Sequence, residues 1–94
     1  MFKVYENENG EKFISVIEAC RELGIASPPQ YKKMRTAKWA RTETLETTGR
    51  TGATYSFMAL PLELVPRWVE TLFSPNINQD KKRELLEIAN KGDK

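Results

Sequence analysis

Few residues of this chain have side chains suited to acid–base, nucleophilic or metal chemistry. Its 94 residues include no histidine and one cysteine, Cys20, which excludes histidine bases, histidine-activated nucleophiles and zinc sites built on imidazoles or several thiolates. Paired carboxylates remain open, because Glu6, Glu8 and Glu11 cluster, but the asparagines and glycine among them favour a solvated turn, which would not raise a carboxyl pKa. No glycine pattern typical of a nucleotide site is present. The sequence therefore predicts a protein that is not an enzyme, with no catalytic residue, cofactor or metal site.

Residues 16–38 have the chemistry of a nucleic-acid contact. They predict two short helices that meet at Gly24, as in a helix-turn-helix, and the second helix presents basic side chains together with an amide and a tyrosine. Such side chains contact phosphates and base edges. A plain corner of two helices with a solvated basic face would show the same pattern, and a net charge of +2 gives only a weak overall field. DNA binding would therefore depend on this local cluster.

Three further residues are candidates for contact with a partner. Arg50 lies between glycines at the expected tip of a hairpin and Arg41 precedes that hairpin, although an ordinary exposed turn would look the same. Trp39 lies outside any apolar stripe and is a candidate interface anchor, unless it covers an edge of the core. The full set of candidate partner- or DNA-binding residues is Gln30, Tyr31, Lys32, Lys33, Arg35, Lys38, Trp39, Arg41 and Arg50.

The elements that must position these residues begin with a hairpin and a helix. Residues 2–5 and 12–16 are β-prone, and the Asn-Gly pair ending at Gly10 supplies the positive φ of a tight turn between them. Ser15, followed three residues later by a glutamate, has the spacing of a helical capping box, and Gly24 can end the helix. The face that this helix should bury consists of Val16, Ala19, Cys20 and Leu23.

A second helix and a second hairpin follow. Ser27 and the two prolines after it mark a helix start, because proline is tolerated in the first turn, and the helix is expected over about residues 29–38. Residues 41–59 are rich in threonine and contain a glycine-flanked turn, which predicts two strands joined at a tip. The candidate contact residues therefore lie on the second helix and along the connection to this hairpin.

Two more helices are predicted after the second hairpin. Pro66 fits near a helix start, and the apolar stripe around it is expected to be core. After a break at residues 74–76, Asn78 can cap a last helix over residues 79–90, with Gly92 beyond its end. The stripe consists of Val65, Trp68, Val69, Leu72 and Phe73, and the inward residues of the last helix are Leu85, Leu86 and Ala89.

Together these elements predict a small single-domain α+β fold with two β-hairpins and about four short helices in the order ββααββαα. Residues 1–94 form the domain, 1–11 its N-terminal strand and turn, and 91–94 a flexible tail. The longest apolar run is only a few residues, so neither a membrane span nor a signal peptide is predicted. Cys20 is expected to be a buried apolar side chain, with a reactive thiol as the alternative, and a reducing cytoplasm suits both.

Residues 19–34 and 59–68, followed by a basic, Leu-rich segment at 82–86, together resemble the N-terminal domain of the phage antirepressor family. The family pairs a Cys-x-x-Leu-Gly-Leu or Ile helix end and a Gln-x-x-Lys helix with a later Leu-Pro-Leu-Glu-x-Leu-Pro-x-Trp-Leu signature and a basic, Leu-rich helix. The matching segments here are ACRELGI (19–25), QYKKM (30–34), ALPLELVPRW (59–68) and KRELL (82–86). Their order and spacing extend the likeness over residues 12–89.

The resemblance implies a temperate-phage or prophage regulator in the cytoplasm of the bacterial host. Such a protein would bind and inactivate a phage repressor by protein contact and so promote lytic induction. The alternative is a sequence-specific DNA-binding regulator that uses residues 16–38. A homo-oligomer is expected in either case, because small regulators are often symmetric. This chain departs from the family pattern at Arg67, Ala37 and the extra residues 70–71, and it ends at Lys94 where family members commonly continue, so a short stand-alone version and an N-terminal domain are both open.

Overall fold

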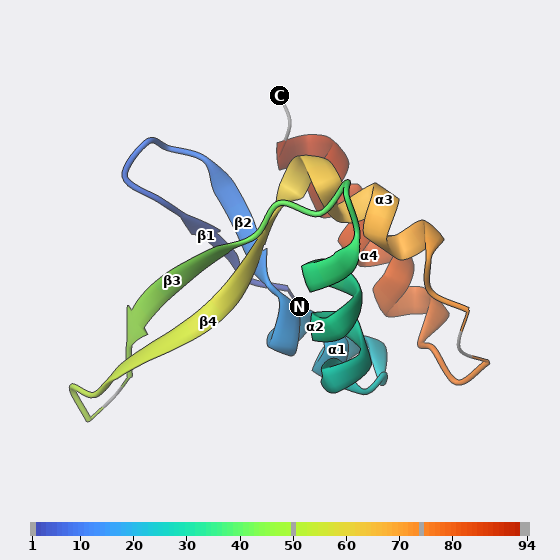
Figure 1. The fold of residues 1–94 in the computed structure, drawn as a ribbon, viewed down its shortest axis with the longest axis horizontal. Coiled ribbons are helices and arrows are strands. Elements are labelled where there is room, and N and C mark those ends of the chain that lie inside the picture. The colour runs from blue at the N-terminus through green and yellow to red at the C-terminus, as the bar shows by residue number, and fades with distance from the viewer. Residues whose placement is uncertain (1, 50, 74, 93–94) are drawn as a thin grey trace.

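Two β-hairpins and two helical pairs alternate along the chain (Figure 1). The structure is a computed structural model that describes residues 2–49, 51–73 and 75–92. It confirms the predicted α+β fold and its ββααββαα order, with a short 3-10 helix, η1, added after the last strand. The elements are β1 (Val4–Glu6), β2 (Lys12–Ser15), α1 (Val16–Leu23), α2 (Ser27–Thr36), β3 (Glu43–Thr48), β4 (Thr54–Pro61), η1 (Leu62–Leu64), α3 (Val65–Glu70) and α4 (Gln79–Gly92).

The described strands form one antiparallel sheet in the order β1-β2-β4-β3. Each hairpin supplies one neighbouring pair, and β2 pairs with β4 to join them, with Ile14 opposite Leu60 in the core. Because side chains alternate along a strand, Phe13 and Phe57 point to the other face, where Tyr5 packs on Phe57 with ring centroids 4.6 Å apart. Figure 1 shows the helices gathered on one side of the molecule, beside this sheet.

Local hydrogen bonds explain the first turn and both ends of α1. Gly10 has a φ of 79°, the left-handed conformation that the tight turn requires. Ser15 Oγ accepts the backbone N–H of Glu18 at 3.4 Å, as predicted, while the Glu18 carboxylate accepts the hydroxyl of Tyr5 at 2.6 Å instead of closing the capping box. Gly24 ends the helix with a φ of 76°, and its N–H donates into the last turn.

Helix α2 begins and ends earlier than predicted. It spans Ser27–Thr36 rather than residues 29–38. Both prolines fit within its first turn, because the first N–H groups of a helix have no partner inside it. The hydroxyl of Thr36 donates to carbonyls of the preceding turn at 3.2 and 3.3 Å, and the following residue becomes extended with a ψ of 130°. Lys38 therefore lies in the loop before β3 rather than on the helix, and Trp39 follows it in that loop.

The core contains a completely buried tryptophan, Trp68, on α3. Four of the five residues in the predicted stripe are buried, but Phe73 is 87 % exposed, so its assignment to the core was wrong. The physical reason is that α3 ends at Glu70 and Thr71 caps it. Beyond that point the chain no longer has helical spacing, which would have placed Phe73 on the same face as Val69.

Helix α4 has the predicted cap. Asn78 Oδ1 accepts the backbone N–H of Lys81 at 3.0 Å, and the helix continues to Gly92, two residues beyond its expected end. Residues 91–92 therefore belong to the helix, and the rest of the predicted 91–94 tail lies outside the described residues. Of the expected inward residues, Leu85 and Ala89 are buried and Leu86 is half-buried against the core.

Candidate functional site

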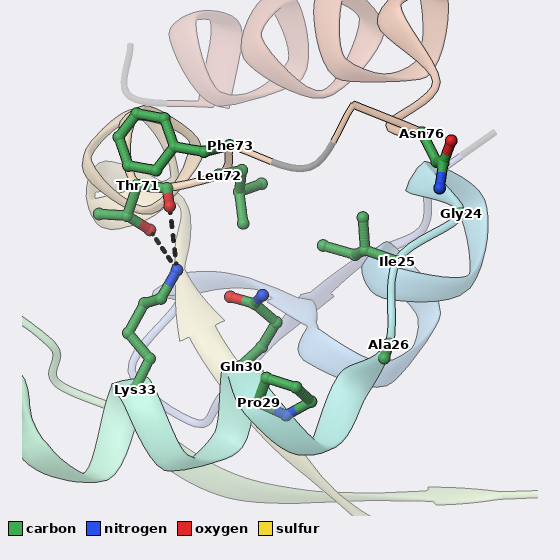
Figure 2. A pocket seen from close by; sticks show the side chains of 10 residues that line it. All are labelled: Gly24, Ile25, Ala26, Pro29, Gln30, Lys33, Thr71, Leu72, Phe73 and Asn76. Atoms are coloured by element: carbon green, nitrogen blue, oxygen red, sulfur yellow. Dashed lines mark hydrogen bonds between the residues drawn. The ribbon is translucent and has the colours of Figure 1, made fainter.

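Two of the predicted contact residues on α2 point into the protein. The indole N–H of Trp68 donates to Gln30 Oε1 at 2.9 Å, and the ammonium group of Lys33 donates to the carbonyl and hydroxyl oxygens of Thr71 at 3.1 and 2.9 Å. Figure 2 shows the two lysine hydrogen bonds crossing from α2 to the residue after α3. These contacts connect α2 to α3 and take Gln30 and Lys33 out of the outer face of α2.

Burial changes the ionisation of two α2 side chains. It lowers the pKa of Lys33, because the charged ammonium loses part of its hydration. It also raises the pKa of Tyr31, whose half-buried ring packs against the core. Tyr31 therefore packs against the core while part of its side chain stays exposed, and its contact with a partner stays a prediction.

Three of the predicted basic residues form an exposed basic face. Lys32 and Arg35 lie three residues apart on α2, on the same side of the helix, and Lys38 follows in the loop. Within residues 2–49, 51–73 and 75–92, none of these three cations takes part in an ion pair. This basic face, defined as Lys32, Arg35 and Lys38, is what the structure retains of the predicted nucleic-acid surface.

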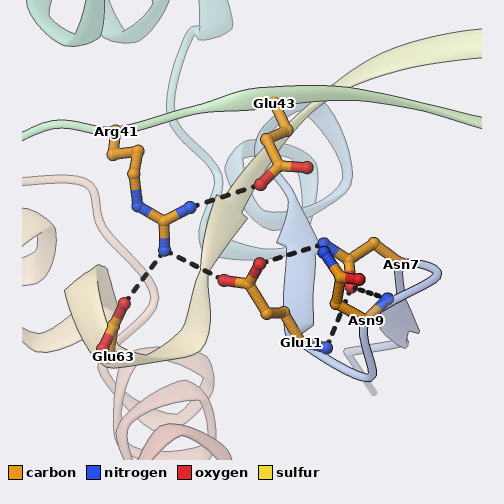
Figure 3. A network of polar contacts seen from close by, with 6 residues as sticks. All are labelled: Asn7, Asn9, Glu11, Arg41, Glu43 and Glu63. Carbon is orange, nitrogen blue, oxygen red and sulfur yellow. Dashed lines mark hydrogen bonds and ion pairs between the residues drawn. The ribbon is translucent and has the colours of Figure 1, made fainter.

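Arg41 lies at the centre of an ion-pair network (Figure 3). Its guanidinium nitrogens lie 3.2 Å from a carboxylate oxygen of Glu11, 3.2 Å from one of Glu43 and 3.0 Å from one of Glu63. The hydrogen bond to Glu63 is the largest cause of a raised Arg41 pKa. Because three carboxylates surround one cation, Arg41 connects the first hairpin, β3 and η1 and adds no positive charge to the basic face.

The two remaining predicted residues do not extend the basic face. Trp39 is half-buried and packs against the core, which is the alternative to an interface anchor. Arg50 lies outside the described residues. Of the predicted basic residues, Lys32, Arg35 and Lys38 are therefore the ones that are exposed without an ion pair among the described residues.

A groove of about 510 Å³ opens beside α2 (Figure 2). One wall is formed by α2 and the turn before it, and the other by the segment that joins α3 to α4. The backbone N–H of Asn78 donates to the carbonyl of Leu23 at 2.9 Å and so fixes this segment to the end of α1. We call this hollow the turn groove; its lining residues are Gly24, Ile25, Ala26, Pro29, Gln30, Lys33, Thr71, Leu72, Phe73 and Asn76.

A second hollow lies next to the same turn. This hollow, of about 390 Å³, shares Ile25 and Ala26 with the turn groove and adds Ile17, which is 38 % exposed. At the opposite end of the turn groove, Phe73 lines the hollow and exposes 87 % of its surface, so it lies at the rim. Both hollows and Phe73 together form a surface that we call the turn surface. Phe73 and Ile17 are the large apolar residues that this surface exposes to solvent.

Sequence reasoning missed the turn surface for a specific reason. Phe73 continues the apolar spacing of α3, and that spacing alone predicts burial. The signal that pointed elsewhere was the proline at position 75, since a helix cannot continue through the sequence just before it without strain. The half-buried Ile25 and the exposed Ala26 likewise carry no sequence signature that separates them from a buried turn.

The start of α2 is poorly suited to anion binding. Pro28 and Pro29 occupy its second and third positions, and neither has a backbone N–H. Those N–H groups are the ones that bind phosphate or carboxylate at a helix start. An anion at this end of α2 would therefore find two fewer backbone donors than at an ordinary helix start.

Reactive groups elsewhere are buried or isolated. Cys20 is buried, as predicted, and burial raises the pKa of its thiol to about 11. Burial, followed by the hydrogen bond to Glu18, raises the pKa of Tyr5 to about 12. Among the described residues, no three acidic or cysteine side chains come close enough together to hold a metal ion. No helix in that part of the chain is long and apolar enough to cross a membrane.

No family model, curated protein or solved structure matches this chain. The likeness to the antirepressor N-terminal domain therefore stays a prediction based on the segments quoted above. The geometry contributes two surfaces to that prediction. One is the apolar turn surface and the other is the basic face, and they lie on different sides of the same helix, α2.

Proposed function

We propose that this chain is a non-enzymatic, antirepressor-type regulator of a phage or prophage. In this proposal it binds a transcriptional repressor by protein contact, takes it off its operator and so promotes lytic induction in the cytoplasm of the bacterial host. The observation that carries the proposal is the exposed position of Phe73 beside the turn groove. Aromatic side chains next to a hollow are frequent anchors of protein interfaces.

The energetics favour a protein partner at this position. Complete burial of a phenylalanine side chain contributes about 1.5–3 kcal/mol, and Phe73 has nearly all of its surface available for burial. A contribution of 2 kcal/mol corresponds to a change of about 30-fold in Kd. Contacts with a sugar–phosphate backbone would bury little of this residue, because that backbone offers little apolar surface.

The decisive experiment is repressor capture. The chain is mixed with the repressor encoded beside its gene, and release of that repressor from labelled operator DNA is followed by gel shift. We expect the wild-type chain at saturating concentration to release the repressor, and Phe73→Ala to need a much higher concentration for the same release. The control is Tyr55→Ala, which changes an aromatic residue on the second hairpin that is 55 % exposed and should release the repressor at the wild-type concentration. A repressor that stays on its operator at saturating chain contradicts the proposal.

A second candidate function, DNA binding, is favoured by the basic face alone. Lys32, Arg35 and Lys38 are exposed cations without an ion pair among the described residues. Three phosphate contacts would give a plot of log K against log salt with a slope of about −2.7. Gel shifts of promoter DNA over a salt series, with Lys32→Ala and Arg35→Ala, measure this slope. DNA binding that survives both substitutions would exclude the basic face.

A further inference from the structure

The charged side chains among the described residues that line the turn surface are all positive. Its apolar floor includes Ile25, Ala26 and Leu72, and each of its two hollows also contains one cation, Lys33 in the turn groove and Arg21 in the second hollow. No aspartate or glutamate lines either hollow among the described residues. An apolar surface that carries only positive charge is complementary to an apolar side chain flanked by carboxylates.

We propose that the turn surface binds an acidic segment of another protein, which inserts one apolar side chain beside Phe73 and Ile25. This inference rests on the proposed function and specifies the chemistry of the repressor segment that is bound. The apolar side chain would cover Phe73 and Leu72, which together offer a partner both exposed and recessed apolar surface. Carboxylates on either side of it would approach Lys33 and Arg21.

Lys33 has the capacity to bind such a carboxylate. An ammonium group has three N–H donors, and two of them are accounted for by the carbonyl and hydroxyl oxygens of Thr71. These two hydrogen bonds fix the position of the ammonium within the turn groove, as Figure 2 shows. The third donor can therefore bind a carboxylate without a change of the lysine conformation, and a fixed donor loses little conformational entropy on binding.

The same geometry argues against DNA as the occupant of this surface. The missing N–H groups of Pro28 and Pro29 remove the backbone donors that would bind a phosphate at the start of α2. The exposed cations of the basic face, Lys32 and Arg35, lie outside the lining of both hollows. A phosphate backbone would therefore bind to the basic face, whereas the turn surface requires an apolar anchor.

Ala26 provides a sharp test, because it is exposed and occupies the N-cap of α2 without a side-chain hydrogen bond. Asparagine and aspartate have the same shape, and neither can form an N-cap hydrogen bond here because Pro28 and Pro29 lack the N–H groups that would donate, so Ala26→Asn and Ala26→Asp are expected to have similar Tm values. Only Ala26→Asp adds a negative charge to the turn surface. The pair therefore separates the charge of the surface from its fold.

The first measurement is fluorescence anisotropy with a defined probe. The probe is a short fluorescein-labelled peptide with one central phenylalanine between pairs of glutamates, and the control probe has lysines in place of the glutamates. We expect the acidic probe to bind the wild type and Ala26→Asn equally, and Ala26→Asp about tenfold more weakly. The lysine probe should bind the wild type at least tenfold more weakly than the acidic probe. Equal binding of the two probes, or of the two variants, overturns the inference.

The second measurement uses the repressor and separates this inference from the proposed function. If the repressor is captured equally well by the wild type, Phe73→Ala and Ala26→Asp, the proposed function stands and the inference fails. If the acidic probe binds with the expected ranking while no repressor is released, the inference stands and the proposed function fails. If sedimentation shows a dimer of the chain that Phe73→Ala dissociates, the surface joins two copies of the chain, which also overturns the inference.

Discussion

Replacement of Gln30 by methionine tests whether this residue supports the fold or faces a partner. Gln30 was a candidate for base recognition, yet its amide oxygen accepts the indole N–H of Trp68, whose side chain is completely buried. Methionine has a similar length and helix propensity but cannot accept this hydrogen bond in the same way. Gln30→Met therefore leaves a buried donor without its partner, while the shape of the side chain is nearly kept.

The expected loss follows from the cost of an unpaired buried donor, which is about 1–3 kcal/mol. In a domain of this size each kcal/mol changes the Tm by roughly 4–8 °C, so a loss of 2 kcal/mol corresponds to a fall of about 8–16 °C. The Trp68→Phe variant lacks the donor. In that background Gln30→Met should cost well under 1 kcal/mol, because no buried N–H is left unpaired.

These four proteins, the wild type, Gln30→Met, Trp68→Phe and the double variant, form a double-mutant cycle. Urea unfolding followed by far-ultraviolet circular dichroism measures the free energy of unfolding of each. The reasoning is refuted if Gln30→Met unfolds at the same urea concentration as the wild type. It is also refuted if the substitution costs the same with and without the tryptophan. In either case the hydrogen bond would not contribute to stability.

Three further predictions concern stability. Gly24→Ala should cost about 1 kcal/mol in thermal unfolding, because a φ of 76° is unfavourable for alanine although its Cβ would meet only the Asn76 carbonyl oxygen at 3.8 Å; an unchanged Tm would contradict this. Arg41→Ala should lower the Tm by a few degrees in low salt and by less in 1 M NaCl, since its three ion pairs are exposed and screened; a salt-independent loss would count against the network. Folding raises the pKa of Cys20 from 9.0 to about 11 and the pKa of Tyr5 from 10.0 to about 12. The stability that depends on the protonated thiol and phenol is therefore complete below pH 9 and is lost as the pH rises to 12. Urea midpoints that stay constant from pH 8 to pH 11 would disprove this coupling.

Local chemistry in the sequence predicted the element boundaries that depend on neighbouring residues. Ser15, Gly24 and Asn78 each act within one helical turn, through a side-chain acceptor or a left-handed backbone, and each cap was found where the sequence placed it. The apolar periodicity of α1 and α4 likewise identified their buried faces, because packing on a core requires that spacing.

The faces of α2 could not be predicted in this way. Its buried contacts, from Gln30 to Trp68 and from Lys33 to Thr71, join residues 38 positions apart and exist only after α3 has packed beside it. In a short polar helix, the sequence does not distinguish a basic or amide side chain that forms a tertiary hydrogen bond from one that faces solvent. Arg41 was ambiguous for the same reason, because its three carboxylates come from separate elements.

The strand order has a consequence for how two copies of the chain can combine. Each half of the molecule contributes one hairpin and one helical pair, and the halves meet through the central β2–β4 pairing and the α2–α3 hydrogen bonds. One connection, residues 37–42, links them. If that connection extends, the first half of one chain can pair with the second half of another through the same contacts. Shortening or stiffening residues 37–42 is therefore the change that would shift the chain between a monomer and a domain-swapped dimer.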